Sequence, residues 1–223
     1  ERYERLVGEL LSAEEGQTFL GQFEAELEDI DSVLKALSLV KSASHRSRDM
    51  VSGFGELWSA RLLSALLRGR EDQHEAVMCL NASDVLVVDA GEMGPVVSWE
   101  PTQANLTDEI PNEFEGIVVI TGYIARNPNG LQVTLGRNGS DYSASIFGAL
   151  LRADAVHIWT DVEGVMTGDP RRVPEATVID EISYNEAMEL AYFGAKVIHP
   201  QTMAPAITHG IPIRIRWTFN PEH

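Results

Sequence analysis

The stretch TLGRNGSDYSASIFGALLRADAVHIWTD, residues 134–161, decides the fold class. It opens with a glycine-rich turn around Gly136 and Gly139, and the periodic apolar residues that follow predict a helix over Ser140–Leu151. Residues Ala155–Thr160 then form a short apolar run that predicts a buried strand. A helix that leads directly into a buried strand is the repeating element of α/β proteins.

Further strands and helices alternate on both sides of this stretch. The apolar runs VLVV at 85–88, IVVITG at 117–122 and IPIRIR at 211–216 each predict a core strand. Helical spacing of apolar residues predicts helices at Tyr184–Phe193 and Ala204–Ile207. We therefore expect an α/β fold, a three-layer sandwich with helices on both faces of a mainly parallel central sheet.

The first third of the chain has a pattern typical of helices without strands. Apolar residues recur at helical spacing through the first 40 residues, and Gly16 predicts a break between helices. The run at 54–67 predicts another helix, which begins at a glycine turn formed by Ser52 and Gly53. Residues 89–112 are rich in Gly, Pro and polar side chains, and we expect them to form a loop or flap.

Composition and charge exclude several classes of protein. With 44% hydrophobic and 23% charged residues, the chain is neither disordered nor collagen-like. Its 17 basic and 34 acidic residues give a net charge of −17, which repels phosphates and argues against a nucleic-acid partner. Cys79 is the single cysteine, so no intrachain disulfide forms and a reducing compartment is favoured. No uncharged apolar run reaches the roughly 18 residues of a membrane-spanning helix, and we expect a cytoplasmic protein.

The glycine-rich turn at 134–144 is the first candidate site. Glycines let backbone N–H groups approach an anion, and the N-terminus of the following helix adds positive partial charge. Arg137 in the turn is suited to hold a carboxylate or phosphate with two parallel hydrogen bonds. Asp141 falls in the first helical turn, where it is either a functional carboxylate or a capping residue.

The second candidate site follows the strand that ends at Thr160. Asp161 lies at the carboxyl end of this strand, where open α/β sheets place ligands, and it suits a Mg²⁺ ion or a ribose hydroxyl. The turn Asp169-Pro170-Arg171 then places an arginine near a bound phosphate. A surface loop with an ordinary turn is the alternative interpretation.

Two further stretches carry isolated charges. Ser183 and Glu186 have the spacing of a capping box. Lys196 follows in an otherwise apolar segment, so its charge requires a partner. Glu56 follows the predicted glycine turn, where it is either a ligand-binding group or a carboxylate that interacts with the helix dipole.

Taken in order, four motifs resemble the kinase domain of aspartate kinases, within the amino-acid kinase family. They are GRNGSDYSA at 136–144, WTDVEGVMTGDPR at 159–171, SYNEAMELAYFGAKVIHP at 183–200 and IPIRI at 211–215 with TFNP at 218–221. The resemblance covers nearly the whole chain as one partial kinase domain, 1–223. It is strongest to the fused aspartate kinase–homoserine dehydrogenase proteins.

The resemblance implies transfer of the γ-phosphoryl group of ATP to the β-carboxylate of L-aspartate, with Mg²⁺ as cofactor, in lysine, threonine and methionine biosynthesis. It implies a substrate side at 1–70 and a nucleotide side at 117–223. In the bound aspartate, Arg137 would bind the α-carboxylate and Glu56 the amino group. Gly139 and Ser140 would bind the remainder of aspartate. Asp141 would organise the catalytic lysine and metal. The nucleotide would contact Thr160, Asp161, Met166, Arg171 and Lys196.

The resemblance also implies an assembly: a homo-oligomer, fused to regulatory ACT domains and homoserine dehydrogenase. A plastid location is implied for a plant protein. The family's Lys-Phe-Gly-Gly loop has no match, so we expect the chain to begin inside the domain and, by itself, not to phosphorylate aspartate. A catalytically inactive fragment or assembly module, and another kinase such as a glutamate 5-kinase or uridylate kinase relative, stay open.

The sequence departs from the family pattern at several positions. The family has Asp where Ser98 stands, Tyr where Met166 stands and Asn where Trp217 stands. Leu80-Asn81-Ala82-Ser83 replaces the usual Leu-Asp-Ala-Arg.

Overall fold

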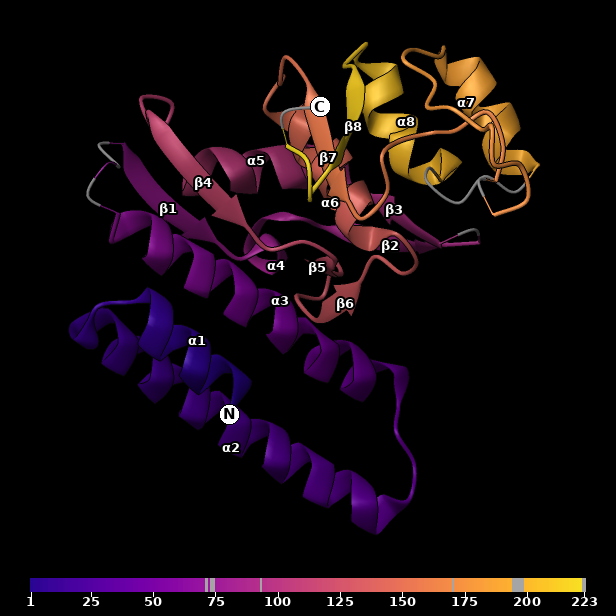
Figure 1. Cartoon of the computed structure of the whole chain (residues 1–223). Helices are drawn as coiled ribbons and strands as arrows, with labels where there is room; N and C mark the ends of the chain where they lie inside the picture. Colours follow the sequence, from indigo (N-terminus) through magenta and orange to yellow (C-terminus); the bar gives the residue numbers. More distant parts are fainter. Residues whose placement is uncertain (71, 73–74, 93, 170, 194–198, 222–223) are drawn as a thin grey trace. The chain divides into compact units, whose positions relative to one another are not determined.

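The computed structural model describes residues 1–70, 72, 75–92, 94–169, 171–193 and 199–221. The chain divides into two compact units, Glu1–Gly136 and Arg137–His223 (Figure 1). Among the residues described, no helix is long and apolar enough to span a membrane.

Three helices form the N-terminal part of the first unit: α1 (Arg2–Leu10), α2 (Ala13–Val40) and α3 (His45–Arg68) (Figure 1). The expected helical start is confirmed, but the break lies at Ser12, whose side chain caps α2, and not at Gly16. Gly16 is buried inside α2, where α1 packs against it. A Cβ at this position would lie only 3.0 Å from Cγ1 of Val7 in α1. The glycine therefore permits two helices to pack closely and does not end one.

An aromatic cluster joins these three helices, comprising Tyr3, Phe19, Phe23, Phe54 and Trp58. Its closest pair is Phe23 and Trp58, with ring centroids 4.6 Å apart in an edge-to-face arrangement. The side chain of Glu26 in α2 accepts hydrogen bonds from the indole N–H of Trp58 at 2.7 Å and from Arg61 at 2.6 Å. Each aromatic pair adds roughly 0.5–1.5 kcal/mol beyond the burial of its area, so the cluster and this network fix α2 against α3.

Helix α3 runs unbroken through Ser52 and Gly53, which corrects the predicted glycine turn. The helix begins earlier, at His45, because the Ser44 side chain caps it. Gly53 is buried, and a Cβ there would overlap the side chain of Gln132. The amide of Gln132 donates a hydrogen bond to the carbonyl of Asp49 at 2.9 Å, so the glycine makes room for a distant strand to dock on the helix.

Among the described residues of the first unit, the strands form three pairs. The parallel pair consists of β1 (Ala76–Leu80) and β4 (Gly116–Ile120), and α3 runs along both. Two antiparallel hairpins join β2 (Val88–Gly91) to β3 (Gly94–Val97) and β5 (Ile124–Arg126) to β6 (Gln132–Thr134). The short helix α4 (Ala82–Val85) follows β1, and α5 (Trp99–Glu109) follows β3.

The run 85–88 is buried as predicted but is not a continuous strand, since only Val87, in a bridge to Arg126, and Val88, in β2, pair with other strands. Val85 ends α4, and β2 begins only at Val88. The start of the run is helical because Asn81 caps a helical turn there: its side chain accepts a hydrogen bond from the Ser83 N–H at 3.0 Å. The asparagine that departs from the family pattern therefore has a capping role.

The prediction of a loop at 89–112 is wrong, because this segment holds most of a hairpin and all of α5. Gly91, Gly94 and Pro95 lie in the hairpin, whereas Pro101 lies in the first turn of α5 and Pro111 follows that helix. Ser98 joins the two elements, since its hydroxyl donates to the carboxylate of Asp89 at 2.5 Å. An aspartate at position 98 would place two carboxylates together, which explains why serine fits here.

The second unit contains α6 (Gly139–Leu150), β7 (Val156–Thr160), α7 (Tyr184–Tyr192), α8 (Pro200–Thr208) and β8 (Ile213–Trp217). Strands β7 and β8 pair in parallel, and α6 packs against α8. Apolar residues of four segments form the core at Ala149, Val156, Ala206 and Ile211. The predicted capping box of Ser183 and Glu186 is present at the start of α7. Helices combined with a parallel strand pair in each unit confirm the α/β fold class.

Candidate functional site

The carboxyl ends of β1 and β4 form one edge of the first unit. The buried side chain of Thr121, directly after β4, accepts a hydrogen bond from the Ala82 N–H, just beyond β1, at 2.8 Å. The N–H of Thr121 donates to the carbonyl of Leu80 at 3.1 Å. These bonds hold the two strand ends together where α/β proteins place their ligands.

Glu56 reaches this edge from the middle of α3. Its carboxylate accepts a hydrogen bond from the backbone N–H of Gly122, the second residue after β4. Burial raises the pKa of Glu56 above its usual range, and the Gly122 N–H opposes that shift only in part. Because Glu56 lies three turns inside α3, the alternative of a carboxylate in the first helical turn is wrong.

The glycine-rich turn of the second unit leads directly into α6. Gly136 and Asn138 adopt left-handed backbone conformations, with φ of 76° and 57°. Gly139 is buried as the first residue of α6, while Arg137 and Ser140 are exposed. The turn therefore presents an arginine and a hydroxyl to solvent beside the positive end of a helix of 12 residues.

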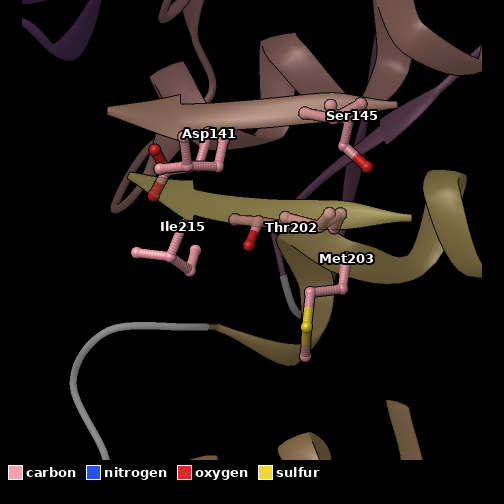
Figure 2. A pocket seen from close by; sticks show the side chains of 8 residues that line it. Asp141, Ser145, Thr202, Met203 and Ile215 are labelled. Atoms are coloured by element: carbon pink, nitrogen blue, oxygen red, sulfur yellow. The ribbon is translucent and has the colours of Figure 1, made fainter. Parts of the chain in front are cut away.

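Asp141 lies in the first turn of α6 and is half-buried. Burial raises its pKa, and a hydrogen bond from Asn138 opposes the shift. The residue lines a small cavity of about 20 Å³, large enough for one water molecule. Figure 2 shows Asp141 and Ile215 toward the carboxyl ends of β7 and β8, with Ser145 and Met203 at the other end of the cavity.

The carboxyl ends of β7 and β8 are also joined by hydrogen bonds. The carbonyl of Thr160 accepts from both the backbone N–H and the hydroxyl of Thr218, each at 2.9 Å. The Thr160 hydroxyl donates to the carboxylate of the exposed Asp161 at 3.3 Å. This edge therefore carries the Thr160-Asp161 pair that the sequence analysis assigned to the nucleotide.

The loop after β7 holds two more of the predicted residues. Met166 is half-buried and pairs with Val178 in an antiparallel bridge. Arg171 is exposed, and its N–H donates to the side chain of Asp169, which makes the predicted turn. Lys196 lies outside the described residues.

A dedicated metal centre is absent from the part of the chain that the structure describes, since no group of three or more His, Cys, Asp or Glu residues gathers there. Mg²⁺ in phosphoryl-transfer enzymes is usually bound by one or two carboxylates together with substrate phosphates and water. An exposed carboxylate such as that of Asp161 suits this mode of binding.

The predicted site residues are divided between the units. Glu56 belongs to the first, while Arg137, Gly139, Ser140, Asp141, Thr160, Asp161, Met166 and Arg171 belong to the second. The expected convergence of Glu56 with Arg137 and Asp141 stays a prediction. No role was predicted for Gly122 or Thr218. Gly122 ends the predicted strand run at 117–122, and Thr218 opens the TFNP motif two residues after the predicted run at 211–216.

The comparisons with known proteins identify the family. The sequence pattern of the amino acid kinase family matches residues 11–216, and the chain belongs to that family. A bifunctional aspartokinase/homoserine dehydrogenase of the chloroplast from Arabidopsis thaliana is 38% identical over 99% of this chain. The corresponding protein of Haemophilus influenzae is 54% identical over 48% of the chain. The chain spans 24% of the length of the first relative, and its matched part covers 13% of the second.

Solved structures agree with the family. Escherichia coli aspartokinase III in complex with aspartate and ADP matches 97% of this chain and 47% of its own, with a TM-score of 0.86 and 32% identity. A UMP kinase from Bacillus anthracis, with a TM-score of 0.52 and 17% identity, shares the fold. The chain is therefore an aspartate kinase-like domain of the amino acid kinase family.

Proposed function

We propose that this domain transfers the γ-phosphoryl group of ATP to the β-carboxylate of L-aspartate. The observation that carries the proposal is the turn Arg137–Asp141, where an exposed arginine and a half-buried carboxylate share one helix N-terminus. The likeness to a structure that contains aspartate and ADP supports this choice of substrates. One carboxylate oxygen of aspartate bonds to the γ-phosphorus, and ADP leaves with the electron pair of the broken bond.

Each residue has a role that its position suits. Arg137 binds the α-carboxylate of aspartate through two parallel hydrogen bonds, and Gly139 and Ser140 bind through the backbone of the turn. Glu56 binds the ammonium group, and its partly buried carboxylate interacts with that charge more strongly than an exposed one would. Asp141 orients the cations that face the transferred group.

The nucleotide occupies the carboxyl edge of β7 and β8 in this proposal. Thr160 and Asp161 contact it there, Met166 and Arg171 contact it from the following loop, and Lys196 supplies a further cation. Mg²⁺ bound with the nucleotide neutralises phosphate charge. Phosphoryl transfer requires positioning and electrostatic stabilisation more than a covalent nucleophile, and these groups supply both.

The same proposal extends to the assembly. Fusion to homoserine dehydrogenase in the relatives supports a multidomain protein, in which ACT domains and self-association regulate the kinase. A cytoplasmic or, in a plant, plastid location accords with these relatives.

Trapping with hydroxylamine tests the reaction. Incubation of the full-length protein that contains this domain with ATP, Mg²⁺, aspartate and hydroxylamine should yield aspartyl hydroxamate, because hydroxylamine captures the acyl phosphate. Residues 1–223 by themselves should yield none. Glutamate and UMP serve as alternative acceptors, and a preference for either would contradict the proposal in favour of another kinase of the family. The variant Asp141→Asn provides the matched inactive control.

A second candidate function is binding of ATP and aspartate without turnover. It is favoured by the positions of the two described lysines, neither of which lies at a strand edge. Lys35 pairs with Asp31 on α2, and Lys41 is the C-terminal cap of the same helix. Calorimetric binding of both ligands without hydroxamate would establish this function, and binding of neither would exclude both candidates.

A further inference from the structure

Two aromatic side chains lie where β8 ends. Trp217 is the last residue of β8, and in the strand register it stands opposite Thr160, the last residue of β7. Phe219 follows two residues later, with its ring centroid 6.5 Å from that of Trp217 and the two planes at 77°. Phe219 is 77% exposed, so a large apolar ring faces solvent at the edge where Thr160 and Asp161 lie.

The face of the strand pair can be assigned from alternation. Side chains of a strand point alternately to opposite faces, so Thr160 lies on the face of Ile158, and Trp217 on the face of Ile215. Ile158 and Ile215 both line the cavity that Asp141 lines. Trp217 therefore belongs to the same face and the same carboxyl edge as Asp141. Trp159, one residue away along β7, belongs to the opposite face.

The backbone that carries the pair is fixed. Thr218, between the two aromatic residues, donates two hydrogen bonds to the carbonyl of Thr160, each at 2.9 Å. The N–H of Asn220 donates to the carbonyl of Trp217 at 3.1 Å and closes a turn around Phe219. A site held in this way binds a ligand without first paying the entropy of ordering the loop.

The exposed ring of Phe219 beside the half-buried Trp217 requires an explanation, because apolar area in water is unfavourable. Because the two planes are nearly perpendicular, a purine stacked on the face of one ring would meet the other ring edge-on, and both arrangements are favourable for aromatic rings. We propose that Trp217 and Phe219 form a stacking platform for the purine base of the nucleotide. This inference rests on the proposed function, which places ATP at this edge.

Two ligands separate the base from the phosphates. ATP carries the purine, whereas inorganic tripolyphosphate carries the same phosphate chain without it. We expect Trp217→Ala to weaken ATP binding by about 5- to 100-fold, the usual effect of losing one aromatic stacking partner, and to leave the affinity for tripolyphosphate unchanged. Phe219→Ala, at an exposed position that leaves the fold intact, should weaken ATP binding in the same direction.

Fluorescence provides the second readout, since the chain has four tryptophans: Trp58, Trp99, Trp159 and Trp217. ATP should change the emission of the native protein and of Trp159→Phe, the control on the opposite face. Trp217→Phe should keep most of the affinity for ATP, because phenylalanine still stacks, and lose that change of emission.

The outcomes distinguish the inference from the function on which it rests. If the native protein binds ATP and both Trp217→Ala and Phe219→Ala bind it equally well, the platform is overturned and the proposed function stands. Equal losses for ATP and tripolyphosphate would also contradict stacking, since a base contact cannot affect a ligand without a base. Native protein that binds neither ligand would overturn the nucleotide edge and the platform together.

Discussion

The two units each carry a parallel strand pair with a half-buried carboxylate near its carboxyl end, but they position that carboxylate differently. In the first unit, Glu56 projects from the interior of a helix of 24 residues and is bound by the N–H of Gly122. In the second unit, Asp141 lies at a helix N-terminus beside Asn138. Burial raises the pKa of both side chains, so a similar electrostatic environment arises from packing in one case and from a local turn in the other.

Asp141→Asn should have the largest effect, because this side chain lies at the turn that carries the proposed chemistry. We expect the rate of aspartyl hydroxamate formation to fall by about 10²- to 10³-fold, the typical effect of removing one electrostatic contributor from an active site. Asparagine keeps the size of the side chain, so the melting temperature should not fall. A variant as active as the native protein would remove Asp141 from the reaction.

Arg137→Ala should affect one substrate and not the other. Loss of a charge-assisted bidentate contact should raise the KM for aspartate by about 10- to 100-fold. ATP affinity, measured by calorimetry, should not change. Arg137→Lys should recover only part of the loss, because lysine cannot form two parallel hydrogen bonds. If the affinities for both substrates fell equally, the assignment of Arg137 to aspartate would be wrong.

Two glycines of α3 test how the first unit is built. Gly53→Ala should lower the free energy of unfolding by about 1–3 kcal/mol, because the new methyl group overlaps Gln132. Gly55→Ala, two residues further along the same helix, meets nothing within 4 Å and should raise it by up to about 1 kcal/mol. Chemical denaturation measures both changes, and equal effects would contradict the described packing of the hairpin on α3.

Glu56→Gln should have the smallest effect, with a sign that depends on pH. The pKa of Glu56 is higher in the folded protein than in the unfolded chain, so its contribution to stability increases as pH falls through the folded-state pKa. Glutamine should therefore raise the melting temperature by about 1–3 °C at pH 7, and the gain should disappear at pH 4. The exposed Glu24→Gln is the matched control. A gain that persists at pH 4 would exclude the carboxylate as its cause.

The second unit could be predicted from sequence to a greater extent than the first. Its helices, strands and capping box depend on signals within a few residues, such as the spacing of Ser183 and Glu186. In the first unit, the roles of Gly16 and Gly53 depend on residues distant from them along the chain or in another element, Val7 and Gln132 respectively. A glycine that permits close packing and a glycine that ends a helix look alike in sequence, so the break and the turn were misplaced.

The site shows the same contrast. The turn and helix start that hold Arg137 and Asp141 could be predicted because they are contiguous in sequence, while the roles of the two side chains stay a prediction. The partner of Glu56 is 66 positions away, at Gly122, and no local pattern connects the two. The hairpin and α5 within 89–112 were missed because Gly and Pro occur in tight hairpins as well as in loops, and Pro101 is tolerated in the first turn of a helix.

The bond between Gln132 and Asp49 has a consequence for the order of folding. It closes a separation of 83 residues, whereas α2 and α3 pack across a connection of only four residues. Contacts over long separations are slow to form because the chain loses more entropy in closing the larger loop. The helical hairpin should therefore form early, and the docking of β6 on α3 late. A late contact is absent from the transition state, so its loss in Gly53→Ala should accelerate unfolding and leave the folding rate almost unaltered.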